Sequence, residues 1–238
     1  MSAFLKFLRA RLSPQGLFGL HLTIGALSLI AAAAIFSVIA GQVVAGAPLT
    51  IRDVQIAQWL HQHATPGWTE FILVITHLNG ITAIILWAIV MGIHLVRNRE
   101  WYWLLSTTIA VAGGMLLNVA LKYTFQRARP SFEEPLLTLS TYSFPSGHTA
   151  ASTVFYGVLA AYLCSRVTAK LTQLAIIMAA ATMVLLVGFS RMYLGVHYFT
   201  DVVAAIAEGC AWLALTLTAV ATLRRRTCLR ANRTANVA

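Results

Sequence analysis

Residues 17–47 read LFGLHLTIGALSLIAAAAIFSVIAGQVVAGA and contain no Asp, Glu, Lys or Arg. An α-helix needs about 20 apolar residues to cross the ~30 Å hydrocarbon core of a bilayer, so this stretch can cross it once. Five further apolar stretches follow, at residues 71–96, 101–121, 144–165, 171–190 and 198–223. None alternates as a membrane strand would. The sequence therefore predicts an all-α, polytopic membrane protein with six transmembrane helices in a bundle.

The composition of the whole chain agrees with a membrane location. Its 238 residues are 59% hydrophobic and only 10% charged, and the mean hydropathy is +0.77. That leaves too little polar surface for a soluble globule, and the few Gly, Pro and Cys residues exclude collagen-like, disordered and disulfide-stapled chains. We predict a single integral-membrane domain, residues 1–238, with no nucleic-acid partner despite the net charge of +10.

The basic residues predict the orientation, because Lys and Arg collect on the cytoplasmic side of membrane proteins. Twelve of the seventeen fall on one side of the six stretches, namely Lys6, Arg9, Arg11, Arg97, Arg99, Arg166, Lys170, Arg224, Arg225, Arg226, Arg230 and Arg233. We expect that side, with both termini, to be cytoplasmic, in a bacterial inner membrane. The other side holds Arg52, Lys122, Arg127, Arg129 and Arg191, which need another explanation.

The connection between the first two stretches predicts a short interfacial helix. Residues 49–54 read LTIRDV, which fits a capping box with Thr50 at the cap and Asp53 reaching back. The apolar run before it is too long for the hydrophobic region of a signal peptide, so we interpret it as a retained anchor.

Residues 122–130, KYTFQRARP, form the first of three polar motifs on the outer side. Lys122 and Arg129 are seven residues apart and would share a helix face, although Pro130 disfavours helix at Arg129. Either geometry lets both side chains bind one anion, Arg as a planar fork and Lys as a point charge. Interfacial snorkelling cations are the alternative, and we keep that interpretation for Arg127.

The second motif, Pro145-Ser146-Gly147-His148, opens the fourth stretch. Proline is favoured at the start of a helix, where backbone N–H groups and the helix dipole attract anions. Gly147 would let the backbone approach a phosphate, and the Ser146 hydroxyl would add a donor. A simple helix cap is the alternative.

The third motif, residues 190–201, reads SRMYLGVHYFTD. His197 and Asp201 lie four residues apart, so on a helix the carboxylate can accept an imidazole N–H and leave the other nitrogen free to attack. A satisfied interfacial pair is the alternative. Glu208 lies seven residues further along the same face, where we favour a structural partner over a proton relay.

Lys-x6-Arg-Pro, Pro-Ser-Gly-His and Ser-Arg-x5-His-x3-Asp, in this order, resemble the tripartite signature of the type-2 phosphatidic acid phosphatase superfamily. The resemblance implies that His197 is the nucleophile, Asp201 orients it and His148 is the general acid. It also implies that Lys122, Arg129, Arg191, Ser146 and Gly147 bind the phosphate, with no metal and no cofactor.

Cations at the outer ends of membrane helices suit a phosphate whose lipid tail stays in the bilayer. We therefore expect a lipid phosphate phosphatase that forms a phosphohistidine, with undecaprenyl (isoprenyl) diphosphate as the first candidate substrate. Phosphatidylglycerophosphate and phosphatidic acid remain alternatives, as does transfer of the phosphoryl group to a second lipid. A lipid-binding or transport protein would not require both histidines and Asp201. The sequence does not indicate an oligomeric state.

Overall fold

The computed structural model describes residues 11–13 and 19–235, without the side chains of 231–235. Lys6, Arg9 and residues 17 and 18, which entered the predictions above, lie outside the described residues, as does the side chain of Arg233. The described part contains helices and no strand. The elements are α2 (Leu20–Val44), α3 (Pro48–Gln62), α4 (Pro66–Leu78), α5 (Ile81–Arg97), α6 (Trp101–Thr108), the π-helical turn Ile109–Gly113, α7 (Gly114–Phe125), α8 (Gly147–Cys164), α9 (Lys170–Tyr193) and α10 (Phe199–Ala235).

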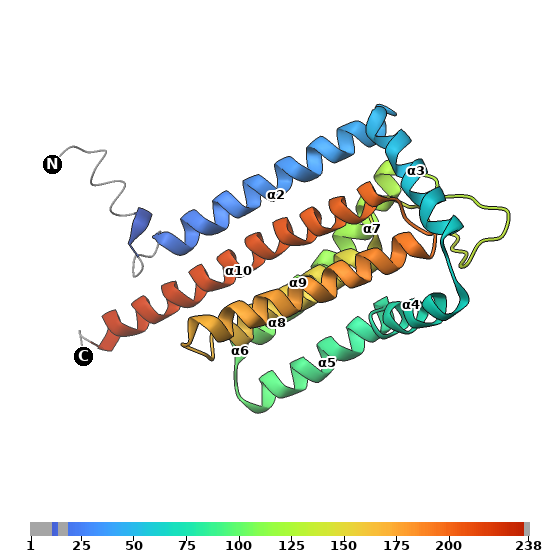
Figure 1. The fold of residues 1–238 in the computed structure, drawn as a ribbon. Helices are drawn as coiled ribbons and strands as arrows, with labels where there is room; N and C mark the ends of the chain where they lie inside the picture. Colours follow the sequence, from blue (N-terminus) through green and yellow to red (C-terminus); the bar gives the residue numbers. More distant parts are fainter. Residues whose placement is uncertain (1–10, 14–18, 236–238) are drawn as a thin grey trace.

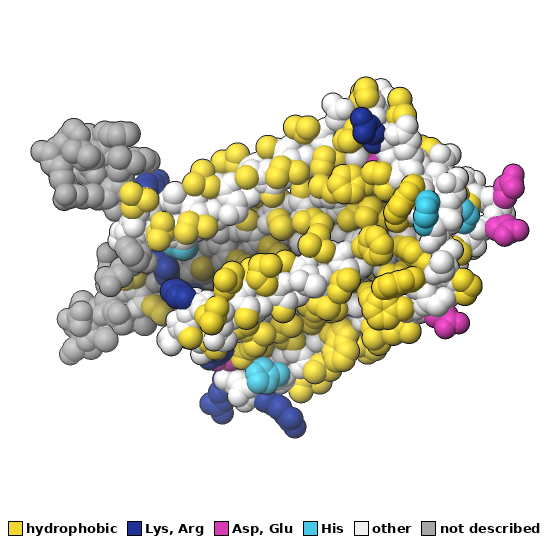
Figure 2. Space-filling model, viewed as in Figure 1, with side chains coloured by type: hydrophobic (Ala, Val, Ile, Leu, Met, Phe, Trp, Pro, Cys, Tyr) yellow, Lys and Arg dark blue, Asp and Glu magenta, His cyan; other side chains and the backbone are white. Residues whose placement is uncertain are grey.

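The long helices run side by side in a bundle, and α3 lies across one end of it (Figure 1). Hydrophobic side chains cover the flank of the bundle. In the same view basic side chains gather at the end where α10 finishes, and acidic ones gather at the end near α3 (Figure 2). An apolar flank between two polar ends is the surface that a bilayer requires.

Within the described residues, four helices are long and apolar enough to cross a membrane: Leu20–Val44, Trp101–Phe125, Lys170–Tyr193 and Phe199–Arg230. The pair α4 and α5 makes a fifth, bent by 45° at the break between them. The predicted stretch at 144–165 becomes α8, which is mostly buried among the other helices and carries polar residues such as Thr149, Ser152 and Thr153. The all-α membrane fold is confirmed, whereas the count of six spans stays a prediction.

Helix α3 exists where the sequence predicts a helix, but the predicted capping box is wrong. Pro48 occupies the first turn, a position that proline favours. Thr50 bonds instead to the Ala47 carbonyl through its own hydroxyl (2.8 Å). Asp53 is only 1% exposed, because its carboxylate has partners elsewhere in the bundle. The interfacial position of α3 stays a prediction.

A π-helical turn between α6 and α7 holds this span, Trp101–Phe125, against α10. The wider turn at Ile109–Gly113 lets the Ile109 carbonyl accept a hydrogen bond from the indole N–H of Trp212 on α10 (3.0 Å). A Cβ at Gly113 would lie 2.4 Å from the Trp212 ring, so glycine is required for this approach. The contact holds α7, and with it Lys122, in place relative to α10.

Candidate active site

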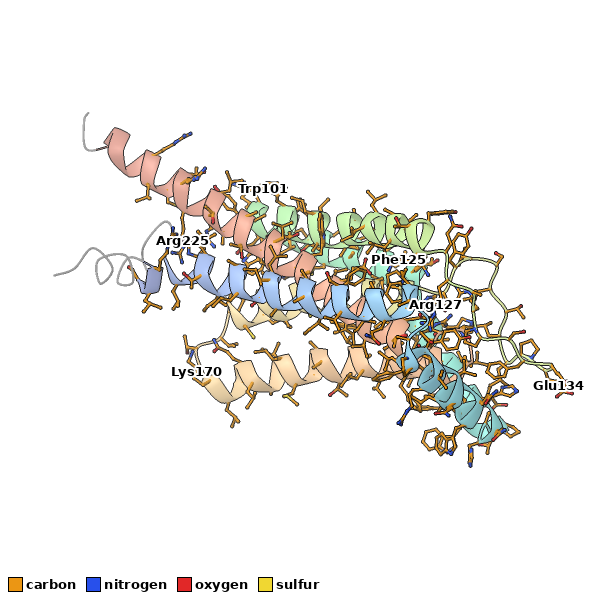
Figure 3. The ribbon with its side chains drawn as sticks, turned by 90° about the horizontal axis from the view of Figure 1, so that it is seen from above. Trp101, Phe125, Arg127, Glu134, Lys170 and Arg225 are labelled. Atoms are coloured by element: carbon orange, nitrogen blue, oxygen red, sulfur yellow. The ribbon has the colours of Figure 1, made fainter. Side chains whose placement is uncertain are left out.

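The three sequence motifs meet at one end of the bundle. There α7 ends, α8 begins, α9 ends and α10 begins, while residues 126–146 fold over these helix ends before the chain enters α8 (Figure 1). Seen from above, Arg127 lies at this end beside Phe125, whereas Lys170 and Arg225 lie at the other (Figure 3). Helix ends supply polar backbone groups and allow several charged side chains to converge.

A left-handed residue starts the loop that carries the arginines. Gln126 has φ of 46°, and its N–H donates to the Lys122 carbonyl, which ends α7. The chain then turns back, and the Arg127 carbonyl accepts the N–H of Ser143 (2.8 Å). Arg129 is therefore outside the helix, as Pro130 predicted, yet it still lies beside Lys122.

Lys122 and Arg129 converge on one backbone oxygen. Lys122 Nζ donates to the Tyr142 carbonyl (2.8 Å), and Arg129 Nη2 donates to the same oxygen (3.0 Å). Arg129 Nη1 donates to the Val196 carbonyl (2.6 Å) and lies 3.2 Å from His197 Nε2. Two of the predicted cations thus stand next to the predicted nucleophile.

Arg191 is buried, with 1% exposure, near the end of α9. Its Nη1 donates to the hydroxyl of Thr76 on α4 (2.6 Å). Its Nε and Nη2 are shielded from solvent and have no hydrogen-bond partner among the residues that the structure describes. A buried guanidinium in this state favours an anion strongly, because unpaired buried donors and charges are costly.

His197 is 2% exposed, in the short link between α9 and α10. Its Nδ1 faces Asp201 Oδ2 at 3.5 Å, and its Nε2 faces Arg129. Since the guanidinium can only donate, the network assigns the proton to Nδ1 and the lone pair to Nε2. Burial lowers the pKa of His197 to about 4, against the opposing hydrogen bond and charge of Asp201. The imidazole is therefore neutral near pH 7 and has a nitrogen available for attack.

Asp201 has more partners than the motif predicts. The carboxylate accepts hydrogen bonds from Ser143 Oγ, from the Tyr198 N–H (2.9 Å) and from Arg127 Nη1 (2.6 Å). Its 3.5 Å separation from His197 Nδ1 is long for a hydrogen bond. Such contacts often tighten only when substrate is bound.

Arg127 is the main residue that sequence reasoning misjudged. It is not a snorkelling cation, because its guanidinium bridges two buried carboxylates, Asp201 at 2.6 Å and Asp53 of α3 at 2.7 Å. Asp53 also accepts the Thr200 hydroxyl and the Thr200 N–H (3.0 Å) at the start of α10. The excess of arginines on the outer side could have indicated this role, because buried arginines require acidic partners on the same side.

The start of α8 differs in detail from the predicted anion cradle. Ser146 precedes the helix, its N–H donates to the Asp201 carbonyl (3.1 Å), and its hydroxyl contacts that of Thr149 (3.0 Å). The cradle therefore begins with the N–H groups of Gly147 and His148, in the first turn. A Cβ at Gly147 would lie 3.2 Å from Asn118 Oδ1 and 3.6 Å from Lys122 Cε, so a larger residue would crowd the lysine.

His148 and Glu208 complete the surroundings. His148 lies within electrostatic range of Arg191, His197, Lys122 and Arg129. Glu208 lies deeper and accepts a hydrogen bond from Asn118 Nδ2 (3.0 Å). Its role as a structural partner stays a prediction. The described residues include no group of three or more His, Cys, Asp or Glu that could hold a metal ion. Three cations around a neutral histidine form a site for a tetrahedral anion.

Comparison with known proteins agrees with this geometry. The family model of the PAP2 superfamily matches residues 101–225. Among curated proteins, phosphatidylglycerophosphatase B of Bacillus subtilis (strain 168) is 34% identical over 146 residues, which cover 60% of this chain and 71% of that protein.

Two solved structures are also similar. One is the transmembrane PAP2-type phosphatidylglycerolphosphate phosphatase from Bacillus subtilis, with a TM-score of 0.73 and 28% identity, covering 79% of this chain and 94% of that one. LpxE from Aquifex aeolicus has a TM-score of 0.56 and 22% identity, covering 69% and 94%, and shows likeness of fold.

Proposed function

The chain belongs to the PAP2 superfamily and is a membrane phosphatase of lipid phosphates, and on that premise we propose that it works through a phosphohistidine at His197. The observation that carries the proposal is the buried guanidinium of Arg191, whose Nε and Nη2 have no partner among the described residues, near the neutral imidazole of His197. An incoming phosphate satisfies both donors and presents its phosphorus to Nε2.

The first chemical step forms a P–N bond. His197 Nε2 attacks phosphorus, the bond from phosphorus to the leaving oxygen breaks, and His148 donates a proton to that oxygen. Arg129, Arg191 and Lys122 hold the other phosphate oxygens, and the N–H groups of Gly147 and His148 add donors. The positive charge on His197 is stabilised by the Asp201 carboxylate.

The second step restores the enzyme. His148, now neutral, accepts a proton from water as the water oxygen attacks phosphorus, and the P–N bond breaks. Inorganic phosphate leaves in this second step for either kind of substrate. The first step has already released the lipid alcohol from a monophosphate, or the lipid monophosphate from a diphosphate. His148 thus regains from water the proton that it gave to the leaving oxygen, and His197 Nε2 regains its lone pair when the P–N bond breaks.

A groove beneath the site supports a lipid substrate. A cavity of about 690 Å³ lies between α5 on one side and α6 and α7 on the other. Apolar residues line it, including Ile85, Leu104, Met115 and Val119. Val119 lies one turn before Lys122, so a lipid tail in the groove can leave its phosphate among the cations. We assign the tail of the substrate to this groove.

We further propose that the single domain has six spans, because α8 adds one span to the four long helices and the bent pair of α4 and α5. Both termini would lie in the cytoplasm, with the site on the outer face of a bacterial inner membrane. The basic end in Figure 2 supports this orientation. The site would then act on lipids whose phosphate has reached the outer leaflet, as recycling of an isoprenyl carrier requires.

Undecaprenyl diphosphate is the first candidate substrate, because several cations at an outer-facing site suit a diphosphate on a long apolar chain. Phosphatidylglycerophosphate is the second candidate, supported by the name of the relative that is 34% identical. The deciding experiment measures phosphate release by the purified full-length protein in detergent from both lipids and from phosphatidic acid. Higher kcat/KM on phosphatidylglycerophosphate would reverse the order.

The same assay tests the reaction class. Release of free phosphate indicates hydrolysis. A newly phosphorylated lipid, formed in an amount equal to the substrate consumed, would indicate phosphotransfer. His197→Ala protein serves as the control for contaminating phosphatases. Phosphate release that persists in this variant would contradict the proposed function.

A further inference from the structure

A second cavity lies at the end of the bundle opposite the candidate active site. It has a volume of about 770 Å³ and lies between α2, α6, α8 and α10. A volume of this size is in the range of ligand-binding pockets. The mechanism above makes no use of it.

The length of α10 separates the two sites. Asp201 is in the first turn of α10, and Arg224, which lines the second cavity, follows 23 residues later. At 1.5 Å per residue this is about 35 Å, more than the hydrocarbon thickness of a bilayer. A ligand in the second cavity therefore contacts the opposite leaflet and cannot reach His197.

The lining of the cavity is apolar inside and basic at its end. Ile24, Leu217 and Val220 supply hydrocarbon surface, while Arg224 and Arg225 come from the last part of α10. The Arg224 guanidinium stands over the ring of Tyr102, 5.9 Å from its centroid. Among the described residues that line the cavity, none is Asp or Glu.

The cavity also contains polar groups that a purely apolar lipid contact would not need. The hydroxyls of Ser28, Ser106 and Thr218 belong to its lining. His21 also lines the cavity, its Nε2 lies 3.2 Å from Thr222 Oγ1, and its Nδ1 is shielded from solvent with no partner among the described residues. An ester or glycerol oxygen suits such donors and acceptors.

A close contact between α2 and α10 shapes the cavity. A Cβ at Gly25 would lie 1.9 Å from Thr218 Oγ1, so the two helices meet there only because residue 25 is glycine. Gly25 also borders a smaller groove of about 440 Å³, lined by Leu22, Leu215 and Arg226, among others. The contact separates two grooves, and the larger one holds the adjacent pair Arg224 and Arg225.

We propose that the larger cavity binds an anionic phospholipid of the leaflet opposite the active site. Its phosphate lies between Arg224 and Arg225, because guanidinium groups bind phosphate oxygens as a fork. Its glycerol region meets the hydroxyls, and one acyl chain lies along Ile24, Leu217 and Val220. Basic pockets between membrane helices on the cytoplasmic side bind anionic head groups in this way.

Cys228 gives a local measurement of occupancy, since it is exposed and lines the cavity. Purified full-length protein in neutral detergent is treated with a maleimide, and modification of Cys228 is followed by peptide mass spectrometry. Dioleoylphosphatidylglycerol should slow the reaction at least threefold more than dioleoylphosphatidylcholine. Binding of either lipid at the distant active site does not affect this readout.

Matched variants test the charge requirement. Arg224→Gln/Arg225→Gln should remove the preference for phosphatidylglycerol, whereas Lys170→Gln, which removes an exposed cation at the same end, should keep it. Ser106→Trp, which fills the cavity and leaves both arginines, should reduce protection by phosphatidylglycerol. Phosphate release in detergent should stay unchanged in all of them, which shows that they are folded.

Three results would overturn the proposal. The first is equal protection by the two lipids, and the second is protection that survives in the double arginine variant. The third is loss of the preference in Lys170→Gln, because the effect would then depend on overall charge. The proposal rests on the cavity and its two arginines and not on a phosphohistidine at His197. Phosphate release that persists in His197→Ala would therefore contradict the proposed function and leave this proposal standing.

Discussion

Asp53 of α3 and Arg127 after α7 form an ion pair with 2.7 Å between Oδ2 and Nη2. The same guanidinium holds Asp201 through Nη1 at 2.6 Å. A helix that precedes the signature motifs is thereby joined to the carboxylate beside the proposed nucleophile. Asp53 is a positioning residue in this arrangement, because it acts on His197 only through Arg127 and Asp201.

The first prediction concerns Asp53→Asn. The change keeps an acceptor for the Thr200 N–H but removes the charge that pairs with Arg127, so Arg127 should pull Asp201 away from His197. We expect kcat to fall at least about tenfold, equivalent to 1.4 kcal/mol on the barrier, with KM little changed because the phosphate ligands are intact. Arg52→Gln, at the neighbouring exposed charge, is the control. A change in KM alone would contradict this role.

The second prediction concerns the proposed nucleophile and its partner. His197→Ala should lower kcat by on the order of 10³-fold or more, and Asp201→Asn should lower it steeply, as loss of a nucleophile and its orienting group does in other enzymes. His63→Ala, at an exposed histidine beyond the site, should have wild-type activity. Near-normal phosphate release from His197→Ala would exclude the mechanism.

The third prediction is the acid limb of the pH profile. Burial lowers the pKa of His197 to about 4 from 6.5, and only the neutral imidazole can attack. The rate constant kcat/KM should therefore fall as the pH drops through about 4, and not near 6.5. An acid limb centred near 6.5 would show that His197 is solvated.

The same shift predicts how stability depends on pH. The unfolded chain binds a proton on this histidine below pH 6.5, whereas the folded one does so only below about 4. The contribution of neutral His197 to stability is thus complete above 6.5 and lost as the pH falls towards 4. Thermal unfolding of the wild type and His197→Ala in this pH window measures the difference.

The fourth prediction concerns Arg191. Vanadate should inhibit by occupying the cation cluster, and excess EDTA should leave activity unchanged. Arg191→Lys keeps the charge but loses the two unpaired donors, so vanadate inhibition should weaken about tenfold or more. Unchanged inhibition in this variant would mean that the phosphate does not reach Arg191.

The fifth prediction tests the proposed topology. Glu134 lies at the exposed tip of the 126–146 segment (Figure 3). A Glu134→Cys variant should react with an impermeant thiol reagent in spheroplasts, while Cys228 should not. Labelling of Cys228 with protection of the new cysteine would place the active site in the cytoplasm.

The sequence predicted that Lys122, Arg129, Arg191 and His197 lie close together, because each lies at or just beyond a helix end and the hydropathy pattern places those ends on one side. It did not predict the role of Arg127, since hydropathy cannot tell which of two arginines two residues apart faces a buried carboxylate. The Asp53 to Thr200 contact joins positions 147 residues apart, a pairing that local patterns do not encode.

The sequence also did not predict two local features of the backbone. A hydropathy window averages over many residues, so the break between α4 and α5 and the π-helical turn both pass as continuous span. The capping box at Thr50 failed because Pro48 starts the helix earlier and because Asp53 gains more from Arg127 and Thr200 than from its own helix end.

Helix α2 packs along α10, so this contact can form only after both helices have been made (Figure 1). The ribosome makes α2 before α10, so α2 has to be stable in a bilayer before this partner exists. The mean hydropathy of α2, 2.4, allows the helix to remain in a bilayer without α10. Because His197 lies just before α10 and Asp201 lies in its first turn, α2 can dock on α10 only after the reactive pair has been synthesised.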